Sequence, residues 1–290
     1  MATVALEIVP TSMDRGYVGA VEEAKKVKAL LHKSGMTDRF NTVVVPHIIP
    51  EDSDRPVALG NKMDPLDSSR ALSEELRVSY VLTQVTVFTP LEKLQSRLKM
   101  LRLAGIERVV FVGVPREVGR HSIVGPSPSE SLQLFQHVMP SRGVILIPTR
   151  LQEEARFLQK VEVGATFAMT QLLFSDHVVH FLRRLGTFTN RPEVILSFGY
   201  VPKVELSVGL LRWLIRDTTD VACEEMAYVA ELAALSFSEK KMRLVELYKK
   251  VIDGASGLGF PLGVHFECPY GVSEPALETF SAMLDVYTPE

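Results

Sequence analysis

Short apolar runs alternate with longer helical segments along the whole of this 290-residue chain, and this pattern limits the folds that it can adopt. Most of the apolar runs are continuous, which is typical of parallel strands that are covered on both faces. The strands predicted in this way are Val4–Val9, Thr42–Val45, Ser79–Val87, Arg108–Val112, Val144–Ile147, Thr166–Thr170, Val194–Phe198 and Leu262–Phe266.

Helical periodicity fills the intervals between these strands. The predicted helices are Val18–Lys33, Ser68–Leu76, Pro90–Leu103, Pro128–Val138, Gln152–Val161, Asp176–Leu185, Val204–Ile215, two within Val221–Ile252, and Glu274–Leu284. Such strand–helix units predict an α/β fold, a (β/α)8 TIM barrel that forms a single domain over residues 1–290. A doubly wound open sheet has the same local pattern. The barrel is favoured because eight units fill the chain and no strand leads into a glycine-rich turn.

Composition excludes several classes of protein. A net charge of −3 without a Lys/Arg-rich run argues against nucleic-acid binding and against a polybasic membrane patch. Cys223 and Cys268 form no CxxC pair, which excludes a disulfide framework and is typical of a reducing compartment. Glu7 interrupts the first apolar run, so we expect no signal peptide, and no run is long enough for a membrane span. We therefore expect a cytoplasmic enzyme with small-molecule partners, no nucleic acid and no membrane.

Familiar cofactor and metal motifs are missing from the sequence. Gly257 and Gly259 form a lone GxG, and there is no GxGxxG, Walker loop, HExxH or GxSxG. His177 and His180 are spaced to share a helix face, but exposed helix histidines are commoner than metal ligands at this spacing. We therefore predict no metal site and no Rossmann-type nucleotide turn.

Glu7 is the residue that most favours a catalytic function. It stands near the C-terminal end of the first predicted strand and shares a strand face with Ala5 and Val9. If that face points into the barrel, burial raises the pKa of the carboxyl, as a general acid near neutral pH requires. The structural alternative is a glutamate held by an Arg or Lys of a neighbouring strand. We favour catalysis, because carboxylates are seldom buried without a task.

The ends of other strands supply candidate substrate-binding residues. Thr170 and Gln171 end the sixth strand, and the Gln171 amide offers a donor and an acceptor for a heterocycle edge such as a pterin. A hydrogen bond to a neighbouring loop is an equally good interpretation of this amide. Glu51 belongs to the polar stretch that follows the second strand, which either lines the site or is a solvated loop.

The last two strands add an aromatic group and an acid. Tyr200 follows the seventh strand and is suited to stack on an aromatic ligand, whereas Phe198 fits core packing equally well. Glu267 ends the eighth strand in His265–Glu267 and is a further candidate for substrate binding. Its alternative is a salt-bridged residue at the rim of the barrel.

Several of these segments resemble those of methylenetetrahydrofolate reductases. VALEIVP resembles their opening (S/F)FEFFPP strand and places Glu7 at their catalytic glutamate. VEVGATFAMTQLLF resembles their (D/A)AGAxxxITQxFF segment and places Gln171 at their pterin-contacting glutamine. The third strand, its helix and the fourth strand follow in the family's order, with an AGI-type turn at Ala104–Ile106. GVHFECP is similar to their closing GVHFYT strand, so the likeness extends through nearly the whole chain.

The chain departs from this family at the flavin contacts. Val81–Gln84 stands where the family has an HLTC-type motif with a histidine, and Gly113–Pro115 replaces an RGD whose aspartate lies near flavin and pterin. Ile147–Arg150 replaces a YPExHPE stretch that embraces the flavin. Of the basic groups that the following helix gives to the FAD phosphates, only Lys160 remains.

This joint loss resembles the flavin-independent branch of the family, described from mycobacteria. The resemblance implies that FAD is absent and that NADH or NADPH takes the place of the isoalloxazine. The predicted cofactor-binding residues are Thr83, Gln84, Gly113 and Pro148, which stand in the substituted segments. The implied reaction is reduction of 5,10-methylenetetrahydrofolate to 5-methyltetrahydrofolate by direct hydride transfer.

Alternatives to this reaction remain open at the level of sequence. One is an FAD-dependent reductase with substituted contacts, and another is a non-catalytic barrel that binds a folate or a nucleotide. A related pterin carrier is also compatible as substrate. The sequence decides neither NADH against NADPH nor the oligomeric state.

Overall fold

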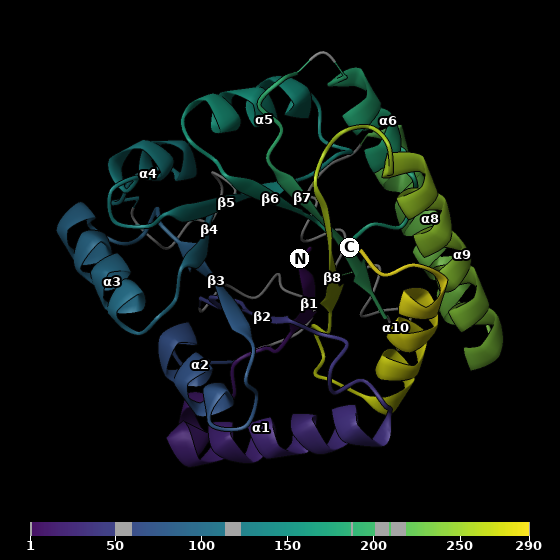
Figure 1. Ribbon diagram of the computed structural model, residues 1–290, viewed down its shortest axis with the longest axis horizontal. Coiled ribbons are helices and arrows are strands. Elements are labelled where there is room, and N and C mark those ends of the chain that lie inside the picture. Colours follow the sequence, from purple (N-terminus) through teal and green to yellow (C-terminus); the bar gives the residue numbers. More distant parts are fainter. Residues whose placement is uncertain are drawn as a thin grey trace.

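A computed structural model describes residues 2–49, 60–113, 123–186, 188–200, 209 and 219–289. Eight parallel strands form a closed barrel, in which β8 pairs with β1 (Figure 1). The strands are β1 (Val4–Glu7), β2 (Thr42–Val45), β3 (Ser79–Val85), β4 (Arg108–Val112), β5 (Ser141–Leu146), β6 (Phe167–Thr170), β7 (Glu193–Gly199) and β8 (Leu262–Glu267). The predicted (β/α)8 barrel is confirmed. The open doubly wound sheet is wrong, because pairing of the first strand with the last closes the ring.

Helices surround the barrel on its outside (Figure 1). They are the short 3-10 helix η1 (Met13–Arg15), then α1 (Gly16–Lys33), α2 (Pro65–Ser73), α3 (Leu91–Leu103), α4 (Pro128–Leu134), α5 (Glu153–Glu162), α6 (His177–Arg184), α8 (Asp220–Ala234), α9 (Phe237–Ala255) and α10 (Glu274–Val286). The helix predicted over Val204–Ile215 lies outside the described residues, apart from residue 209. Within the described ranges, no helix has the length and apolar character needed to cross a membrane.

Local chemistry accounts for the main differences between predicted and observed ends. Helix α2 begins at Pro65 rather than Ser68, because the Asp64 carboxylate accepts a 2.8 Å hydrogen bond from the Leu66 N–H and caps the helix. Strand β5 begins earlier than predicted, at Ser141, since pairing with β4 extends it through a polar stretch that has no apolar pattern.

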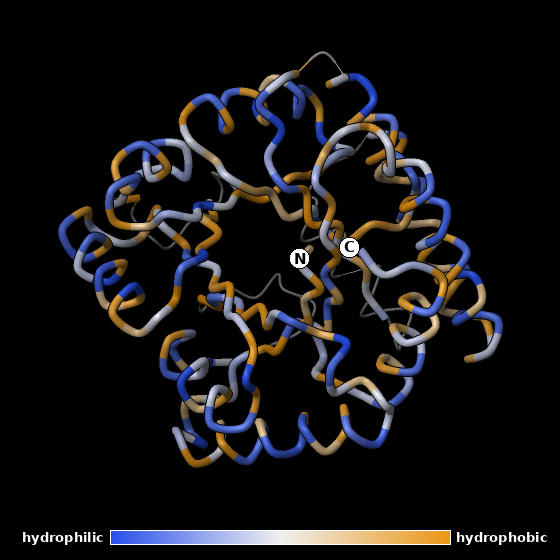
Figure 2. Tube along the Cα trace, viewed as in Figure 1, coloured by the Kyte–Doolittle hydropathy of each residue, from blue (hydrophilic) through white to orange (hydrophobic). Residues whose placement is uncertain are grey.

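The hydrophobic core has an inner and an outer part. The inner part fills the barrel and consists of Ala5, Val44, Val81, Val110, Phe167, Met169 and Ile195. The outer part lies between the strands and the helices, whose sequences alternate hydrophilic and hydrophobic residues along their turns (Figure 2). Ala5 lies inside and Leu6 lies in the outer core, so strand alternation directs Glu7 to the inner side.

The N-terminal end of the barrel is closed by a polar network. The Arg108 guanidinium donates to the Thr3 hydroxyl at 2.8 Å and to the Glu193 carboxylate at 2.6 Å, and it lies 4.4 Å from the centre of the Phe167 ring. Gly143 makes room for that ring, since a Cβ at this position would stand 2.4 Å from it. With this end filled, chemistry is left to the C-terminal mouth, where TIM barrels build their sites.

Candidate functional site

Two glutamates end neighbouring strands at the C-terminal mouth of the barrel. Glu7 is the last residue of β1 and Glu267 the last residue of β8. The register pairs Ala5 with His265 and Leu6 with Phe266, so the next residues along, Glu7 and Glu267, stand side by side on the inner face. Glu7 is partly buried and the Glu267 side chain is 13% exposed. The structure thus brings together two acids that the sequence places at opposite ends of the chain.

The electrostatics of this corner favour the protonated form of Glu267. Burial raises the pKa of the Glu267 carboxyl well above its ordinary value, and the charge of Glu7 raises it further, while the Ser197 hydroxyl works against the rise. The pKa of the neighbouring Cys268 thiol is also raised, by burial first and then by the charges of Glu7 and Glu267. The corner therefore retains a proton at pH values at which an ordinary glutamate is ionised.

A buried histidine lies one layer below the two acids. His265 is 1% exposed, and its Nδ1 stands 3.1 Å from the Ser197 Oγ and 3.6 Å from the Glu267 Oε1. Burial lowers the pKa of His265 to about 3, so the imidazole is neutral and gives Glu267 no positive partner. Its Nε2 is buried and finds no hydrogen-bond partner within the described part of the chain.

Gln171 and Thr170 face opposite sides of the sheet. Phe167 and Met169 belong to the inner core, so alternation brings Gln171 to the inner side at the mouth, where its side chain is partly buried. Among the described residues its amide has no hydrogen-bond partner, and it is free to contact a ligand. Thr170 is 2% exposed, and its Oγ1 accepts a 2.8 Å hydrogen bond from the Ser197 N–H. This contact gives Thr170 a structural task between β6 and β7.

The remaining predicted substrate-binding residues differ in position. Tyr200 directly follows β7, partly buried, with its ring centre 6.2 Å from that of Phe237 and 5.8 Å from the Lys240 Nζ. Phe198 is 1% exposed and packs in the outer core. Glu51 lies outside the described residues.

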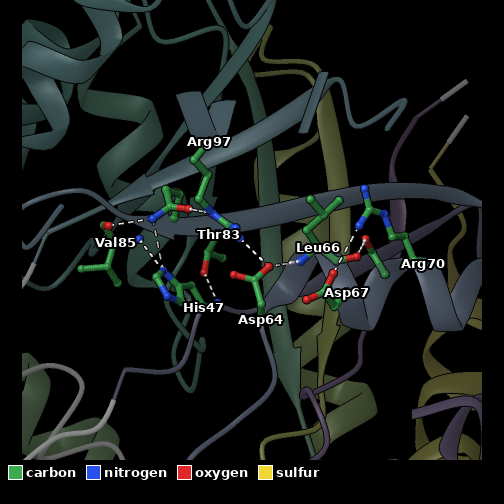
Figure 3. Close-up of polar contacts among 10 residues, drawn as sticks. His47, Asp64, Leu66, Asp67, Arg70, Thr83, Val85 and Arg97 are labelled. Atoms are coloured by element: carbon green, nitrogen blue, oxygen red, sulfur yellow. Dashed lines mark hydrogen bonds and ion pairs between the residues drawn. The ribbon is translucent and has the colours of Figure 1, made fainter. Parts of the chain in front are cut away.

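Thr83 and His47 are joined where β2 and β3 reach the mouth (Figure 3). The Thr83 hydroxyl accepts a 2.7 Å hydrogen bond from the His47 N–H. The His47 Nδ1 accepts from the Val85 N–H at 3.2 Å. Burial lowers the pKa of His47 to about 4, and the positive charge of Arg97 contributes to the shift, so this imidazole is neutral. In this neutral state Nδ1 can accept the hydrogen bond from the Val85 N–H.

Gln84 extends this network away from the barrel. It is 1% exposed, and its amide donates to the Val85 carbonyl at 2.8 Å and accepts from the Arg97 Nε at 2.8 Å. The Arg97 guanidinium also donates to the Asp64 carboxylate at 2.7 Å, and this carboxylate caps α2 (Figure 3). Its place indicates that Gln84 fixes the end of β3 relative to α2 and α3, while cofactor contact by this residue stays a prediction.

Gly113 and Pro148 follow β4 and β5 at the same mouth. A Cβ on Gly113 would stand 3.3 Å from the Pro128 ring, so its glycine allows close packing on the start of α4. Pro148 borders a cavity of about 520 Å³ that lies between the N-terminal ends of α5 and α8 and extends along α6. Arg150 and Arg184 also line this cavity and bring guanidinium groups to it, whereas burial lowers the pKa of His177, which lines it as well.

Metal binding and disulfide formation find no support in the described ranges. No group of three or more His, Cys, Asp or Glu side chains there could hold a metal ion. The rings of His177 and His180 lie 6.4 Å apart, and the His180 Nε2 faces the Asp176 carboxylate at 4.0 Å. Cys223 is exposed, Cys268 is buried, and both are free.

Sequence reasoning missed several residues that shape the mouth. Ser197 and Arg97 were not among the predicted site residues. His47 entered only as the first residue of the polar stretch after the second strand, and His265 only as a neighbour of Glu267. A signal for His265 was present, since it stands two positions before Glu267 on the same strand face. Ser197 and Arg97 carried no such signal, because their contacts depend on which strands and helices become neighbours.

The solved structures that match this chain include proteins of distant sequence. A protein from Clostridium thermocellum, described as uncharacterized and as binding two copies of 5-methyl-5,6,7,8-tetrahydrofolic acid, is 13% identical with a TM-score of 0.72. That match covers 98% of this chain and 95% of that chain. A tryptophan synthase complex from Pyrococcus furiosus matches at 14% identity and a TM-score of 0.44, over 79% of this chain and 95% of that chain. No curated protein matches the chain.

A family comparison covers the chain from end to end. The family described as mycobacterial methylenetetrahydrofolate reductase matches residues 1–290. This agrees with the resemblance carried by the opening and sixth strands, whose Glu7 and Gln171 now lie at one barrel mouth. The chain belongs to the mycobacterial methylenetetrahydrofolate reductase family.

Proposed function

We propose that this protein reduces 5,10-methylenetetrahydrofolate to 5-methyltetrahydrofolate, with hydride passing directly from NADH or NADPH to the folate. The observation that carries the proposal is the inner-face placement of Glu7 and Gln171 at the same mouth, in a chain of this family. A carboxylic acid and a side-chain amide that can bind the pterin edge are the groups that such a reaction needs from the protein.

The chemistry begins with the five-membered imidazolidine ring of the substrate. Proton transfer to N10 breaks the bond from N10 to the bridging methylene, whose electron pair stays on N10, and a 5-iminium cation forms. We assign this proton transfer to Glu7, which lies beside Glu267, whose pKa is raised. A carboxylate at this place also balances the charge of the cation. Hydride addition to the iminium carbon then gives the methyl group and oxidises the nicotinamide.

Gln171 is the group that we propose to hold the pterin. A pterin edge offers adjacent donors and acceptors, and a side-chain amide offers one of each. Gln171 presents its amide on the inner side, whereas Thr170 uses its hydroxyl within the sheet. We therefore assign pterin contact to Gln171 and a supporting position to Thr170.

The cavity next to Pro148 supports a place for the nicotinamide nucleotide. Arg150, Arg184 and His177 lie around about 520 Å³ of space, and dinucleotide phosphates are bound by arginines and helix N-termini. Glu153, Glu154 and Asp220 also line it, and Glu154 pairs with Arg184, so the charge of the cavity is mixed. FAD is proposed to be absent, on the sequence departures at Gly113–Pro115 and Ile147–Arg150.

The Clostridium thermocellum protein adds modest support. It is described as binding 5-methyl-5,6,7,8-tetrahydrofolic acid, which is the product of the proposed reaction. Its 13% identity to this chain establishes a common fold, and the ligand is a property of that protein.

One spectrophotometric experiment tests the proposed function. The purified protein is scanned in the visible range, and NADH oxidation is then followed as methylenetetrahydrofolate is added, with a repeat in NADPH. We expect a colourless protein that oxidises the nicotinamide only in the presence of the folate, with ternary-complex kinetics. A flavin spectrum that NADH alone bleaches would instead establish an FAD-dependent reductase. Ligand binding without turnover with either nucleotide would establish a non-catalytic barrel.

A further inference from the structure

The corner formed by β1 and β8 contains two carboxyl groups, whereas a general acid requires only one. Glu7 and Glu267 end these strands side by side on the inner face. In parallel strands about 4.8 Å apart, carboxyl groups on neighbouring residues of one face are close enough to repel each other strongly when both are ionised. One proton shared between the two groups removes that repulsion.

Among the described residues, no positively charged side chain lowers the pKa of Glu267. The titratable groups that the described residues bring to Glu267 are Glu7, His265 and Cys268. His265 is neutral because it is 1% exposed, and the Cys268 thiol is buried and protonated. The Glu267 side chain, at 13% exposure, also receives little help from water.

We propose that Glu7 and Glu267 form a proton-sharing carboxyl pair, in which one carboxyl protonates N10 of the substrate while the other stays ionised and balances the iminium cation. In this step the O–H bond of the carboxyl breaks, an N10–H bond forms, and the electron pair of the methylene–N10 bond stays on nitrogen. Two carboxyl groups with separate tasks are a known solution when acid and counter-charge are needed in one site. The inference deepens the proposed function and rests on it for the identity of the substrate.

Positioning of Glu267 depends on the layer below it. The Ser197 Oγ lies 2.8 Å from the Thr170 carbonyl and 3.1 Å from the His265 Nδ1, so one hydroxyl ties β6, β7 and β8 together beneath the pair. The His265 Nδ1 in turn stands 3.6 Å from the Glu267 Oε1. This layer limits the movement of the Glu267 side chain and keeps it beside Glu7.

The first test is the pH profile of kcat in Glu267→Gln and Glu267→Asp. In the wild type, activity falls at alkaline pH as the shared proton is lost. Gln carries no charge and therefore cannot raise the pKa of Glu7. We expect the alkaline limb of the Glu267→Gln profile to move to lower pH by about one unit or more. We also expect kcat near neutral pH to fall about 10-fold or more. Asp keeps a titrating carboxyl and should retain the alkaline limb near its wild-type position. A Glu267→Gln profile that superimposes on that of the wild type would overturn the pair.

The second test requires no turnover. A raised native pKa means that the folded state holds the proton more tightly, so the Glu267 contribution to stability is lost as pH rises from the unfolded-state pKa of about 4.3. Glu267→Gln should therefore gain stability relative to the wild type as pH rises, in urea unfolding between about pH 5 and pH 8. The gain should shrink in a Glu7→Gln background, since the pair is then already broken. A gain that is the same with and without Glu7 would refute sharing of the proton.

Glu225→Gln provides a matched control outside the barrel mouth. Glu225 is 3% exposed, burial raises its pKa, and it accepts a 2.5 Å hydrogen bond from the Ser175 hydroxyl. Its replacement should leave the pH profile of kcat unchanged and should show no coupling to Glu7.

If the stability experiment shows the pair but no folate is reduced, the proposed function fails while the pair stands. If folate is reduced but the stability gain of Glu267→Gln does not depend on Glu7, the pair fails while the function stands.

Discussion

Replacing Thr170 with Val separates two tasks that this residue could have, support of the fold and contact with the folate. The Thr170 Oγ1 accepts a 2.8 Å hydrogen bond from the Ser197 N–H, and the residues are 2% and 0% exposed, respectively. Val has nearly the same shape, so the substitution leaves no cavity but leaves the buried N–H of Ser197 without its acceptor. An unsatisfied buried donor costs about 1–3 kcal/mol. For a chain of this size that corresponds to a decrease in Tm of roughly 2–4 °C per kcal/mol.

Urea unfolding at fixed pH measures this cost, and steady-state kinetics of the same preparation measures the folate KM. We expect a lower unfolding midpoint with an unchanged slope, and a folate KM that stays close to the wild-type value. Thr170→Ser is the control, because it keeps the hydroxyl and loses only a methyl group, worth about 0.8 kcal/mol. If Thr170→Val unfolds like the wild type but raises the folate KM several-fold, the hydroxyl contacts substrate and the structural reasoning is refuted.

Three further predictions address the mouth of the barrel. Glu7→Gln should still fold and should lower kcat by about 10²-fold or more, and a near-normal kcat would remove Glu7 from the mechanism. Gln171→Ala should raise the folate KM more than it lowers kcat, because its amide has no partner among the described residues, and an unchanged KM would make Gln171 structural. His47, whose pKa burial lowers to about 4, should stay neutral at pH 6 by NMR. Its contribution to stability, present above the unfolded-state pKa of about 6.5, should be lost as pH falls towards 4, and a pH-independent difference between the wild type and His47→Gln would contradict this sign.

The sequence by itself determined the architecture, because the signal for each strand and helix is local. Continuous apolar runs marked the positions of the strands. Because eight strand–helix units fill the chain, a closed barrel was favoured over an open sheet. Strand alternation also determined that Glu7 shares the inner face with Ala5. Element ends were less well determined, as at α2, where the Asp64 cap moved the start of the helix.

Contacts between distant segments of the chain determine which side chains meet at the mouth. Glu7 and Glu267 become neighbours only because β1 pairs with β8 in one particular register, and a shift of that register by one residue would put the two side chains on opposite faces. The same holds for Gln84, whose amide is directed to Arg97 of α3 rather than into the barrel. Register and helix packing are set by contacts between distant segments, so no local pattern in the sequence encodes the pKa of Glu267 or the neutral state of His265. Each of these properties follows from burial and from neighbours that closure of the barrel supplies.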